Sequence, residues 1–361
     1  MKRILTLRQA QGENTKKRIL TGDRPTSESF HLGNYIGSLK NRVKLQDEYE
    51  TFILIADLHA LTTHFDKTDD LKKNIQGLML GYLSVGLDPA KVTFCLQSGI
   101  PETTELAYFL SVLTQRAVLQ RQPALKEKLD QGNQDTVGLY YYPVLMAADI
   151  LLPKANLVPV GKDQKAHVEF ARDIAIKFDH LYGEVFPIPE PLIGEVPTLP
   201  GTDGKYKMGK SLGNAIFLTD SPEEVEKKVM SMYTDPTRIK ISDPGHVEGN
   251  PVFIYLDAFS GESLDFAQDK SGQGKVASLK DQYQKGQVGD IEVKKYLVEV
   301  LNNFLSPIRE SRARFERDPE LVEGILKEGT AKARLEAQKT LKEVKAAMKL
   351  DYFQFVQRSY Q

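Results

Sequence analysis

The sequence lacks the features that mark several large classes of protein. It contains one cysteine, Cys95, among 361 residues, which excludes an internal disulfide framework and a cysteine-rich zinc or iron–sulfur site. It has no run of about 18 apolar residues, so we expect no membrane-spanning helix. Its 48 Lys and Arg residues are balanced by 49 Asp and Glu, which argues against a basic coat that binds nucleic acid regardless of sequence.

The remaining composition is that of a globular protein. Hydrophobic residues make up 41% and charged residues 27% of the chain, and the length fits about two domains. The N-terminus is basic but has no apolar stretch of a secretory signal, so a cytoplasmic location is expected. The charge is uneven, because residues 1–45 carry ten Lys or Arg against three Asp or Glu. A local basic contact surface is therefore compatible with a net charge near zero.

The first half of the chain alternates between short apolar strands and helical patterns. Residues 52–56 form a continuous apolar run, as expected for a strand that is buried on both faces. The pattern predicts strands at 18–21, 52–56, 91–97 and 157–161, and helices at 32–49, 69–85, 102–119 and 163–177. Such alternation is typical of an α/β fold with a doubly wound parallel sheet, Rossmann-like in kind.

The second half is organised differently. Residues 183–213 are rich in Pro and Gly and favour a functional loop, whereas Ser221-Pro222-Glu223-Glu224 is a strong helix start. Residues 261–289 are polar and turn-rich, and 331–348 form a charged amphipathic pattern. We therefore expect four parts: a basic N-terminal extension (1–17), a Rossmann-like catalytic domain (18–220), a helical domain (221–330), and a C-terminal helix and tail (331–361).

The first candidate motif is His31-Leu32-Gly33-Asn34, at the expected start of the first crossover helix. Ligands of doubly wound sheets bind outside the carboxyl ends of the strands, often at a helix N-terminus that favours anions. His31 and Asn34 are hydrogen-bond donors three residues apart on one helical face, which suits phosphate oxygens. A helix cap together with a packing glycine explains the motif equally well.

The second candidate motif, Lys207-Met208-Gly209-Lys210-Ser211, lies within the Pro- and Gly-rich segment. Two lysines that are three residues apart around a glycine form a flexible cationic clip, which suits closure on a transient polyphosphate charge. Basic loops are more often simply solvated.

Two further segments place an acid in an informative position. Asp163 follows the predicted strand and Gly161, where it could accept hydrogen bonds from ribose hydroxyls or cap a helix. Asp149 lies in the apolar run from Met146 to Leu152, where a carboxylate is costly without a partner. It could accept one N–H from an apolar ligand or make a structural hydrogen bond to the backbone.

The two signatures together resemble those of class I aminoacyl-tRNA synthetases, because their order along the fold is specific. The chain further resembles tryptophanyl-tRNA synthetases of the bacterial type. The matching segments are 21–26, 33–37, 57–62, 142–152, 158–164 and 249–253.

The resemblance implies a residue-by-residue assignment of the site. The catalytic residues would be His31, Asn34, Lys207 and Lys210. ATP would be bound by Arg24, Pro25, Thr26, His31, Gly33, Asn34, Gly161, Lys162, Asp163, Lys207, Met208, Gly209, Lys210 and Ser211, with an adenine-contacting backbone position near Leu199. Tryptophan would be bound by Leu20, Gly22, His59, Tyr142, Met146, Asp149, Val158, Val160 and Gln164, with Tyr142 and Gln164 at the α-amino group and Asp149 at the indole N–H.

The chain departs from the family pattern at a few positions. Gly209 stands where the loop usually has Ser, and Ser27 stands where Gly commonly follows Pro-Thr. Asp23-Arg24 replaces the Ile-Gln of many bacterial members. These differences bear on catalytic efficiency more than on reaction type.

The implied function is that of a tryptophan–tRNA ligase. ATP with Mg²⁺ is the implied cosubstrate, with no protein-bound metal or iron–sulfur cluster. The implied partners are L-tryptophan, tRNA(Trp) and a second copy of the chain, and the helical domain would bind the anticodon. Three alternatives stay open: a tyrosyl-tRNA synthetase, a small nucleotidyltransferase, and a regulatory or RNA-binding paralogue that has lost catalysis.

Overall fold

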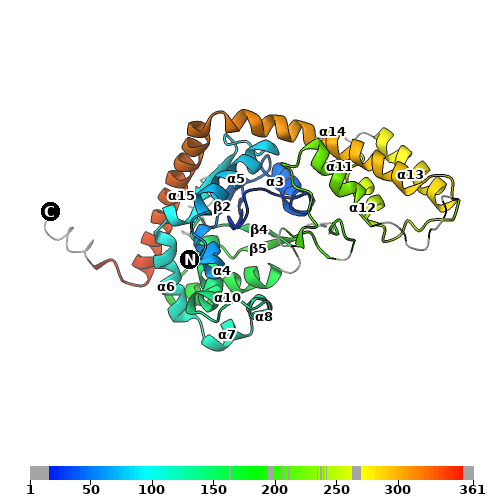
Figure 1. Ribbon diagram of the computed structural model, residues 1–361. Coiled ribbons are helices and arrows are strands. Elements are labelled where there is room, and N and C mark those ends of the chain that lie inside the picture. Colours follow the sequence, from blue (N-terminus) through cyan, green and yellow to red (C-terminus); the bar gives the residue numbers. More distant parts are fainter. Residues whose placement is uncertain are drawn as a thin grey trace, which may run out of the picture.

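A parallel β-sheet forms the centre of the protein (Figure 1). In the computed structural model, the described residues are 16–161, 164–193, 199–204, 206–209, 212–233, 235, 238, 240, 242–261 and 270–352. Within them the sheet has five strands in the order β3-β2-β1-β4-β5. The strands are β1 (Arg18–Asp23), β2 (Glu50–Ile55), β3 (Val92–Leu96), β4 (Leu157–Val160) and β5 (Glu190–Ile193). All neighbouring pairs are parallel, which confirms the predicted doubly wound α/β fold.

The sheet is buried on both faces, as the apolar run in β2 predicts. Phe52 and Leu54 belong to one hydrophobic core, and the alternating Ile53 and Ile55 belong to the other. Successive side chains of a strand point to opposite faces, so a strand needs apolar residues at every position to fill two cores. Cys95 of β3 is buried in the first of these cores.

Helices cover each face of the sheet. The core of Phe52 contains side chains from α6 (Glu102–Leu113), α9 (Val137–Leu151) and α10 (Lys165–Tyr182). The opposite core contains α5 (Leu71–Ser84) and the first crossover, which runs through α2 (Leu32–Asn34), a π-helical turn η1 (Tyr35–Leu39) and α3 (Lys40–Leu45). Shorter helices α4 (Asp57–His64), α7 (Arg116–Gln120) and α8 (Pro123–Asp130), and the turn η2 (Gln97–Gly99), lie in the connections.

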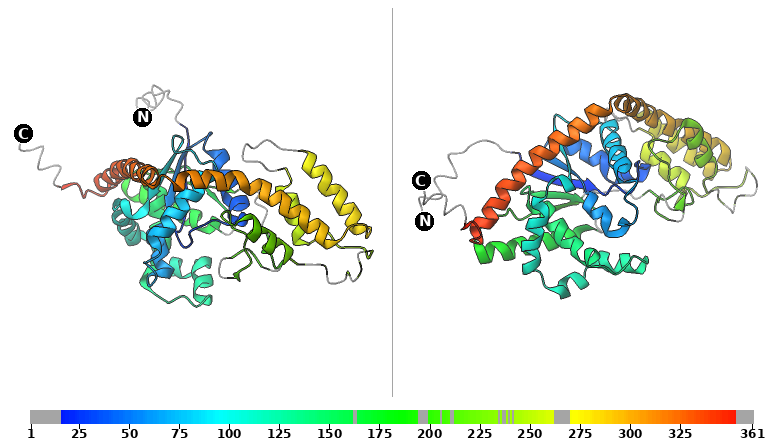
Figure 2. Two further views of the ribbon diagram at one scale, coloured as in Figure 1. Left: turned by 45° about the horizontal axis from the view of Figure 1, so that its top comes forward. Right: turned by 60° about the vertical axis from the view of Figure 1, so that its left-hand side comes forward.

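The second half forms a helical arm that extends from the sheet and then returns to it (Figures 1 and 2). Its helices are α11 (Pro222–Met230), α12 (Pro251–Phe259), α13 (Lys270–Gln284) and α14 (Asp290–Glu316). The last helix, α15 (Pro319–Ala347), packs against β3, α6 and α5. As predicted, α11 starts at a capping box in which Ser221 and Glu224 bond each other's backbone N–H. No described helix has the length and hydropathy needed to cross a membrane.

Several predicted boundaries were wrong. The segment 183–213 contains β5, and the turn-rich 261–289 contains α13. The helix predicted at 102–119 is split into α6 and α7 by an extended Thr114, and the helix predicted at 32–49 already ends at Leu45. The helix expected at 331–348 begins at Pro319, which has the fixed φ that suits a first helical position.

α15 closes the exposed edge of the sheet at β3. The Thr330 hydroxyl accepts a hydrogen bond from the Leu96 N–H at 3.0 Å, which satisfies a donor that an edge strand would leave unpaired. A Cβ placed on Gly329 would lie 2.0 Å from the Phe94 carbonyl oxygen, so only glycine permits this approach. Ion pairs from Arg334 to Glu102 and from Lys345 to Glu105 hold the same helix against α6.

We predict that Gly329→Ala destabilises the protein, because the added methyl group meets strand backbone that cannot move aside. The expected loss is about 1–3 kcal/mol of unfolding free energy, the usual effect of overpacking. Gly324→Ala is a matched control on the same helix, because no atom lies within 4 Å of its added Cβ. It should raise stability by about 0.5–1 kcal/mol through helix propensity. Thermal unfolding of both variants measures the difference, and equal melting temperatures would contradict the prediction.

Candidate active site

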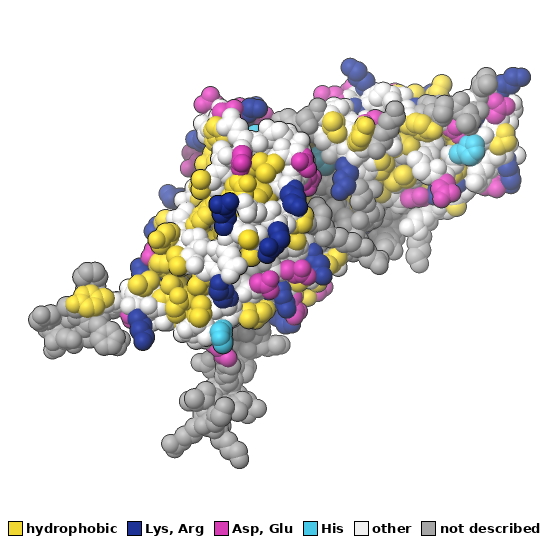
Figure 3. All heavy atoms as spheres, turned by 90° about the horizontal axis from the view of Figure 1, so that it is seen from below, with side chains coloured by type: hydrophobic (Ala, Val, Ile, Leu, Met, Phe, Trp, Pro, Cys, Tyr) yellow, Lys and Arg dark blue, Asp and Glu magenta, His cyan; other side chains and the backbone are white. Residues whose placement is uncertain are grey.

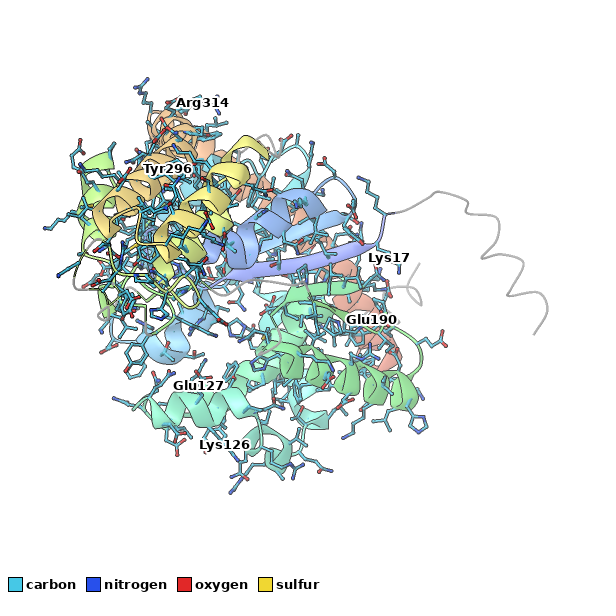
Figure 4. The ribbon with its side chains drawn as sticks, turned by 90° about the vertical axis from the view of Figure 1, so that its right-hand side faces the viewer. Lys17, Lys126, Glu127, Glu190, Tyr296 and Arg314 are labelled. Atoms are coloured by element: carbon cyan, nitrogen blue, oxygen red, sulfur yellow. The ribbon has the colours of Figure 1, made fainter. Side chains whose placement is uncertain are left out.

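A cavity of about 660 Å³ opens at the carboxyl ends of β1 and β4. Here the strand order reverses direction, which is where doubly wound sheets bind their ligands. Glu127 of α8 lines the cavity, whereas Lys17 and Glu190 lie on the opposite side, at the amino ends of β1 and β5 (Figure 4). The structure brings together all nine residues predicted for the amino-acid pocket: Leu20, Gly22, His59, Tyr142, Met146, Asp149, Val158, Val160 and Gln164.

Gly22 lines the cavity with backbone alone. A Cβ at this position would lie 2.1 Å from the Leu54 carbonyl oxygen of the neighbouring strand. Leu20 of the same strand and Val158 and Val160 of β4 provide apolar walls. This part of the cavity therefore suits a flat apolar group that lies against backbone.

Asp149 provides a buried acceptor in these apolar surroundings. Its side chain is held by two hydrogen-bond partners, the His59 ring at 2.8 Å and the Gln97 amide at 2.9 Å and 2.8 Å. All three residues are buried. Side chains therefore provide the hydrogen bonds that the buried carboxylate requires. The alternative prediction, a structural hydrogen bond from Asp149 to the backbone, is not what the structure shows.

Two cationic side chains contribute to the lining of the cavity. Arg24 and Lys128 both line it, and Arg24 donates to the Thr63 hydroxyl at 3.3 Å. Burial, followed by the nearby charge of Arg24, lowers the pKa of Lys128 to about 8. The Lys128 ammonium lies 4.0 Å from the centre of the Tyr142 ring. Two cations that face one cavity favour an anionic ligand.

Tyr142 presents an unused polar group. Burial raises the pKa of its phenol to about 12, so the hydroxyl stays protonated near neutral pH. The buried oxygen has no hydrogen-bond partner among the described residues. A buried hydroxyl without a partner is costly, and a ligand amino group in the cavity would satisfy it.

His31 and Asn34 form a cap on the first crossover helix. The Asn34 N–H donates to His31 Nδ1 at 3.2 Å, and the His31 N–H donates to Asn34 Oδ1 at 3.0 Å. Burial lowers the pKa of His31 to about 4, so the ring is neutral at pH 7 and carries its proton on Nε2. His31 therefore keeps one side-chain donor, Nε2–H, and contributes no positive charge.

The two signature motifs contact each other although they are 175 residues apart. The Gly33 N–H donates to the Met208 sulfur at 3.3 Å, and Met208 is buried in the hydrophobic core that also contains side chains of α12. Asn214 holds the second motif, because its amide oxygen accepts from the Gly209 N–H and its nitrogen donates to the Lys207 carbonyl. Lys207 itself is exposed. Asn214 thus holds the backbone of the loop, while the Lys207 side chain extends to the surface.

The remaining predicted residues fall into three groups. Gly161, like Arg24, lines the cavity, while Leu199 is buried in the core. The residues predicted for ATP or catalysis that do not line the cavity are Pro25, Thr26, His31, Gly33, Asn34, Leu199, Lys207, Met208 and Gly209. Lys162, Asp163, Lys210 and Ser211 lie outside the described residues.

Three residues of the site escaped the sequence analysis: Gln97, Lys128 and Asn214. Gln97 follows directly after β3, so its position at the carboxyl end of a strand was an available signal. Lys128 lies on α8, a helix that the sequence did not predict. Asn214 comes shortly after the second signature and is buried. No local pattern indicated this, because a polar residue in a loop is usually exposed.

Comparison with known proteins identifies the family. The family described as tRNA synthetases class I (W and Y) matches residues 12–306. A tryptophan–tRNA ligase of Treponema pallidum is 49% identical over 92% of this chain and 97% of its own length. The chain belongs to the tryptophanyl-tRNA synthetases.

Further relatives agree with this membership. A tryptophan–tRNA ligase of Streptococcus pyogenes is 47% identical over 94% of this chain and its own full length. A crystal structure of the Campylobacter jejuni tryptophanyl-tRNA synthetase, complexed with ADP and tryptophan, has a TM-score of 0.81 at 38% identity. It covers 92% of this chain, and this chain covers 99% of it. The predicted resemblance to bacterial tryptophanyl-tRNA synthetases and the predicted enzyme class are confirmed.

We predict that His31 makes the stability of this synthetase depend on pH. Because its folded-state pKa of about 4 lies below the usual value of 6.5, the unfolded chain binds more protons between these values. The contribution of His31 to stability is therefore complete above pH 6.5 and is lost as the pH falls toward 4. In His31→Asn, which keeps a capping oxygen, the unfolding free energy should fall less steeply over this range. Denaturant titrations at several pH values test this, and parallel curves would refute it.

Proposed function

We propose that this site activates L-tryptophan with ATP and transfers it to the 3′ end of tRNA(Trp). A tryptophan carboxylate oxygen attacks the α-phosphorus of ATP, the bond to the bridging oxygen breaks, and pyrophosphate leaves. The terminal ribose hydroxyl of the tRNA then attacks the acyl carbon, loses its proton and displaces AMP. The observation that carries this proposal is the gathering of the nine predicted pocket residues around one cavity with Asp149 as its buried acceptor.

The amino acid occupies the part of the cavity between β1, β4 and α9. Its indole ring lies among Leu20, Val158 and Val160, and its ring N–H donates to Asp149. The α-amino group bonds Tyr142, whose hydroxyl has no protein partner among the described residues, and Gln164. An indole N–H only donates and an ionised carboxylate only accepts, so the two groups match.

ATP occupies the region between the two signatures and the cationic residues Arg24 and Lys128 of the cavity. Arg24 and Lys128 offer positive charge to its phosphates, and His31 offers a neutral Nε2–H donor. Lys207 and Lys210 act on the charge that develops as pyrophosphate leaves. Mg²⁺ enters with the phosphates of ATP as part of the substrate. No side chain acts as a nucleophile, so catalysis rests on positioning and charge stabilisation.

The tRNA and a second subunit complete the assembly. The helical residues 221–330 contact the anticodon, because they extend away from the site that receives the acceptor end (Figure 2).

A homodimer is supported by Tyr108 and Val112, which lie one turn apart on α6 and are 64% and 66% exposed. Figure 3 shows hydrophobic side chains gathered among Lys and Arg on the face seen from below. Charging of tRNA assigns the protein to the cytoplasm.

ATP–pyrophosphate exchange with each amino acid in turn tests the proposed activity. Exchange should depend on tryptophan alone, because only the indole offers both a flat apolar body and a single N–H donor. Exchange that depends on tyrosine would replace the proposal with a tyrosyl-tRNA synthetase. Absence of exchange with every amino acid would identify a paralogue without catalysis.

We predict that Asp149→Ala raises the KM for tryptophan by at least about tenfold, with little change for ATP. A hydrogen bond to a charged group contributes about 1.5–3 kcal/mol, and its loss should appear only for the ligand that makes it. Steady-state exchange kinetics with each substrate varied separately give the two constants. Equal increases for tryptophan and ATP would instead indicate that Asp149 only maintains the structure.

A further inference from the structure

We propose that Gln97 determines how strictly the enzyme requires the indole N–H, because it fixes the orientation of the Asp149 carboxylate. This inference rests on the proposed function of Asp149 as the acceptor for that N–H. Gln97 does not line the cavity and therefore does not touch the substrate. It acts through Asp149, as a positioning residue.

Gln97 lies directly behind the carboxylate. Its amide nitrogen donates to both oxygens of Asp149, at 2.9 Å to Oδ1 and 2.8 Å to Oδ2. The side chain is completely buried at the end of β3, with 0% of its surface exposed. No solvent competes for these bonds, so they are stronger than the same contacts would be at the surface.

The same amide also fixes the other partner of Asp149. Its oxygen accepts the backbone N–H of His59 at 3.2 Å, while the His59 ring contacts Asp149 Oδ2 at 2.8 Å. One side chain thereby joins the end of β3 to the first turn of α4 and to α9. Its loss would release both supports of the carboxylate together.

The two oxygens of Asp149 are not equivalent in this arrangement. Oδ2 contacts both His59 and Gln97, whereas Oδ1 contacts only Gln97 among the described residues. Each carboxylate oxygen has two acceptor positions, so Oδ1 keeps one for a ligand. The terminal torsion of an aspartate is broad and poorly defined by itself, so external bonds must fix the direction of that position. A fixed acceptor discriminates between ligands that donate and those that do not, whereas a rotating one discriminates poorly.

A pair of substrates isolates this effect. Tryptophan and its benzothiophene analogue, β-(benzo[b]thiophen-3-yl)alanine, are similar in shape, but the analogue has sulfur in place of the N–H. The ratio of their kcat/KM values in ATP–pyrophosphate exchange measures the requirement for the N–H. A residue that only stabilises the fold would alter both values equally and leave their ratio unchanged.

The matched control is Gln46→Met. Gln46 is also a buried glutamine, and its amide bonds the Gly86 carbonyl and the Asp88 N–H at 3.1 Å and 2.9 Å. It does not line the cavity. Gln97→Met and Gln46→Met thus remove the same kind of side chain from the same kind of environment. Gln97→Asn serves as a second variant, because it keeps a polar amide but withdraws it from Asp149 by one methylene.

We expect Gln97→Met and Gln97→Asn to reduce the preference for tryptophan over the analogue by about tenfold, with an unchanged KM for ATP. Gln46→Met should keep the wild-type preference, and Asp149→Ala should abolish it. If Asp149→Ala abolishes the preference while both Gln97 variants retain it, the positioning role of Gln97 is wrong and Asp149 keeps its role. If Asp149→Ala itself retains the preference, the assignment of Asp149 fails and the role of Gln97 fails with it.

Discussion

A carboxylate buried in an otherwise apolar helix determines how three parts of the chain meet. Asp149 lies in α9 with 6% of its surface exposed, and such a group requires hydrogen-bond donors. The donors come from His59 in α4 and from Gln97 after β3. Because both must reach one carboxylate, α4, α9 and the end of β3 converge beside the carboxyl ends of β1 and β4. The cavity opens at this point, so the bonds that satisfy the buried carboxylate also shape the wall of the cavity.

The second organising contact joins the two signatures. Gly33 and Met208 meet across the core, and the neighbouring strand-like bridge between His31 and Phe217 keeps the loop in register with the first crossover. Asn214 fixes the backbone on either side of Met208. The backbone of Lys207, the residue before Met208, is therefore held in place, while its side chain is exposed.

The sequence predicted those features that leave a local physical pattern. Continuous apolar runs indicated β1 to β4, and an acid among apolar residues marked Asp149. β5 escaped because it has four residues, includes Pro191 and is only partly buried, so that its pairing with β4 alone defines it. α13 escaped because its glycines and polar residues favour turns, whereas the buried Val276 and Tyr283 anchor it. Gln97 and Lys128 required tertiary structure, since no local pattern shows which polar side chain turns toward a cavity.

The return of α15 to β3 has a consequence for synthesis on the ribosome. β3 is an edge strand of the sheet, and the helix that covers its open side follows much later in the sequence, after all the described strands. While the chain is being made, the nascent sheet exposes an unpaired edge to other nascent chains until residues 319–347 have been synthesised. A chain truncated before Pro319 would contain all five described strands but would lack the helix that covers β3, so its edge could pair with other chains. Quality control of truncated copies could recognise this unpaired edge, although all residues that line the cavity precede Pro319.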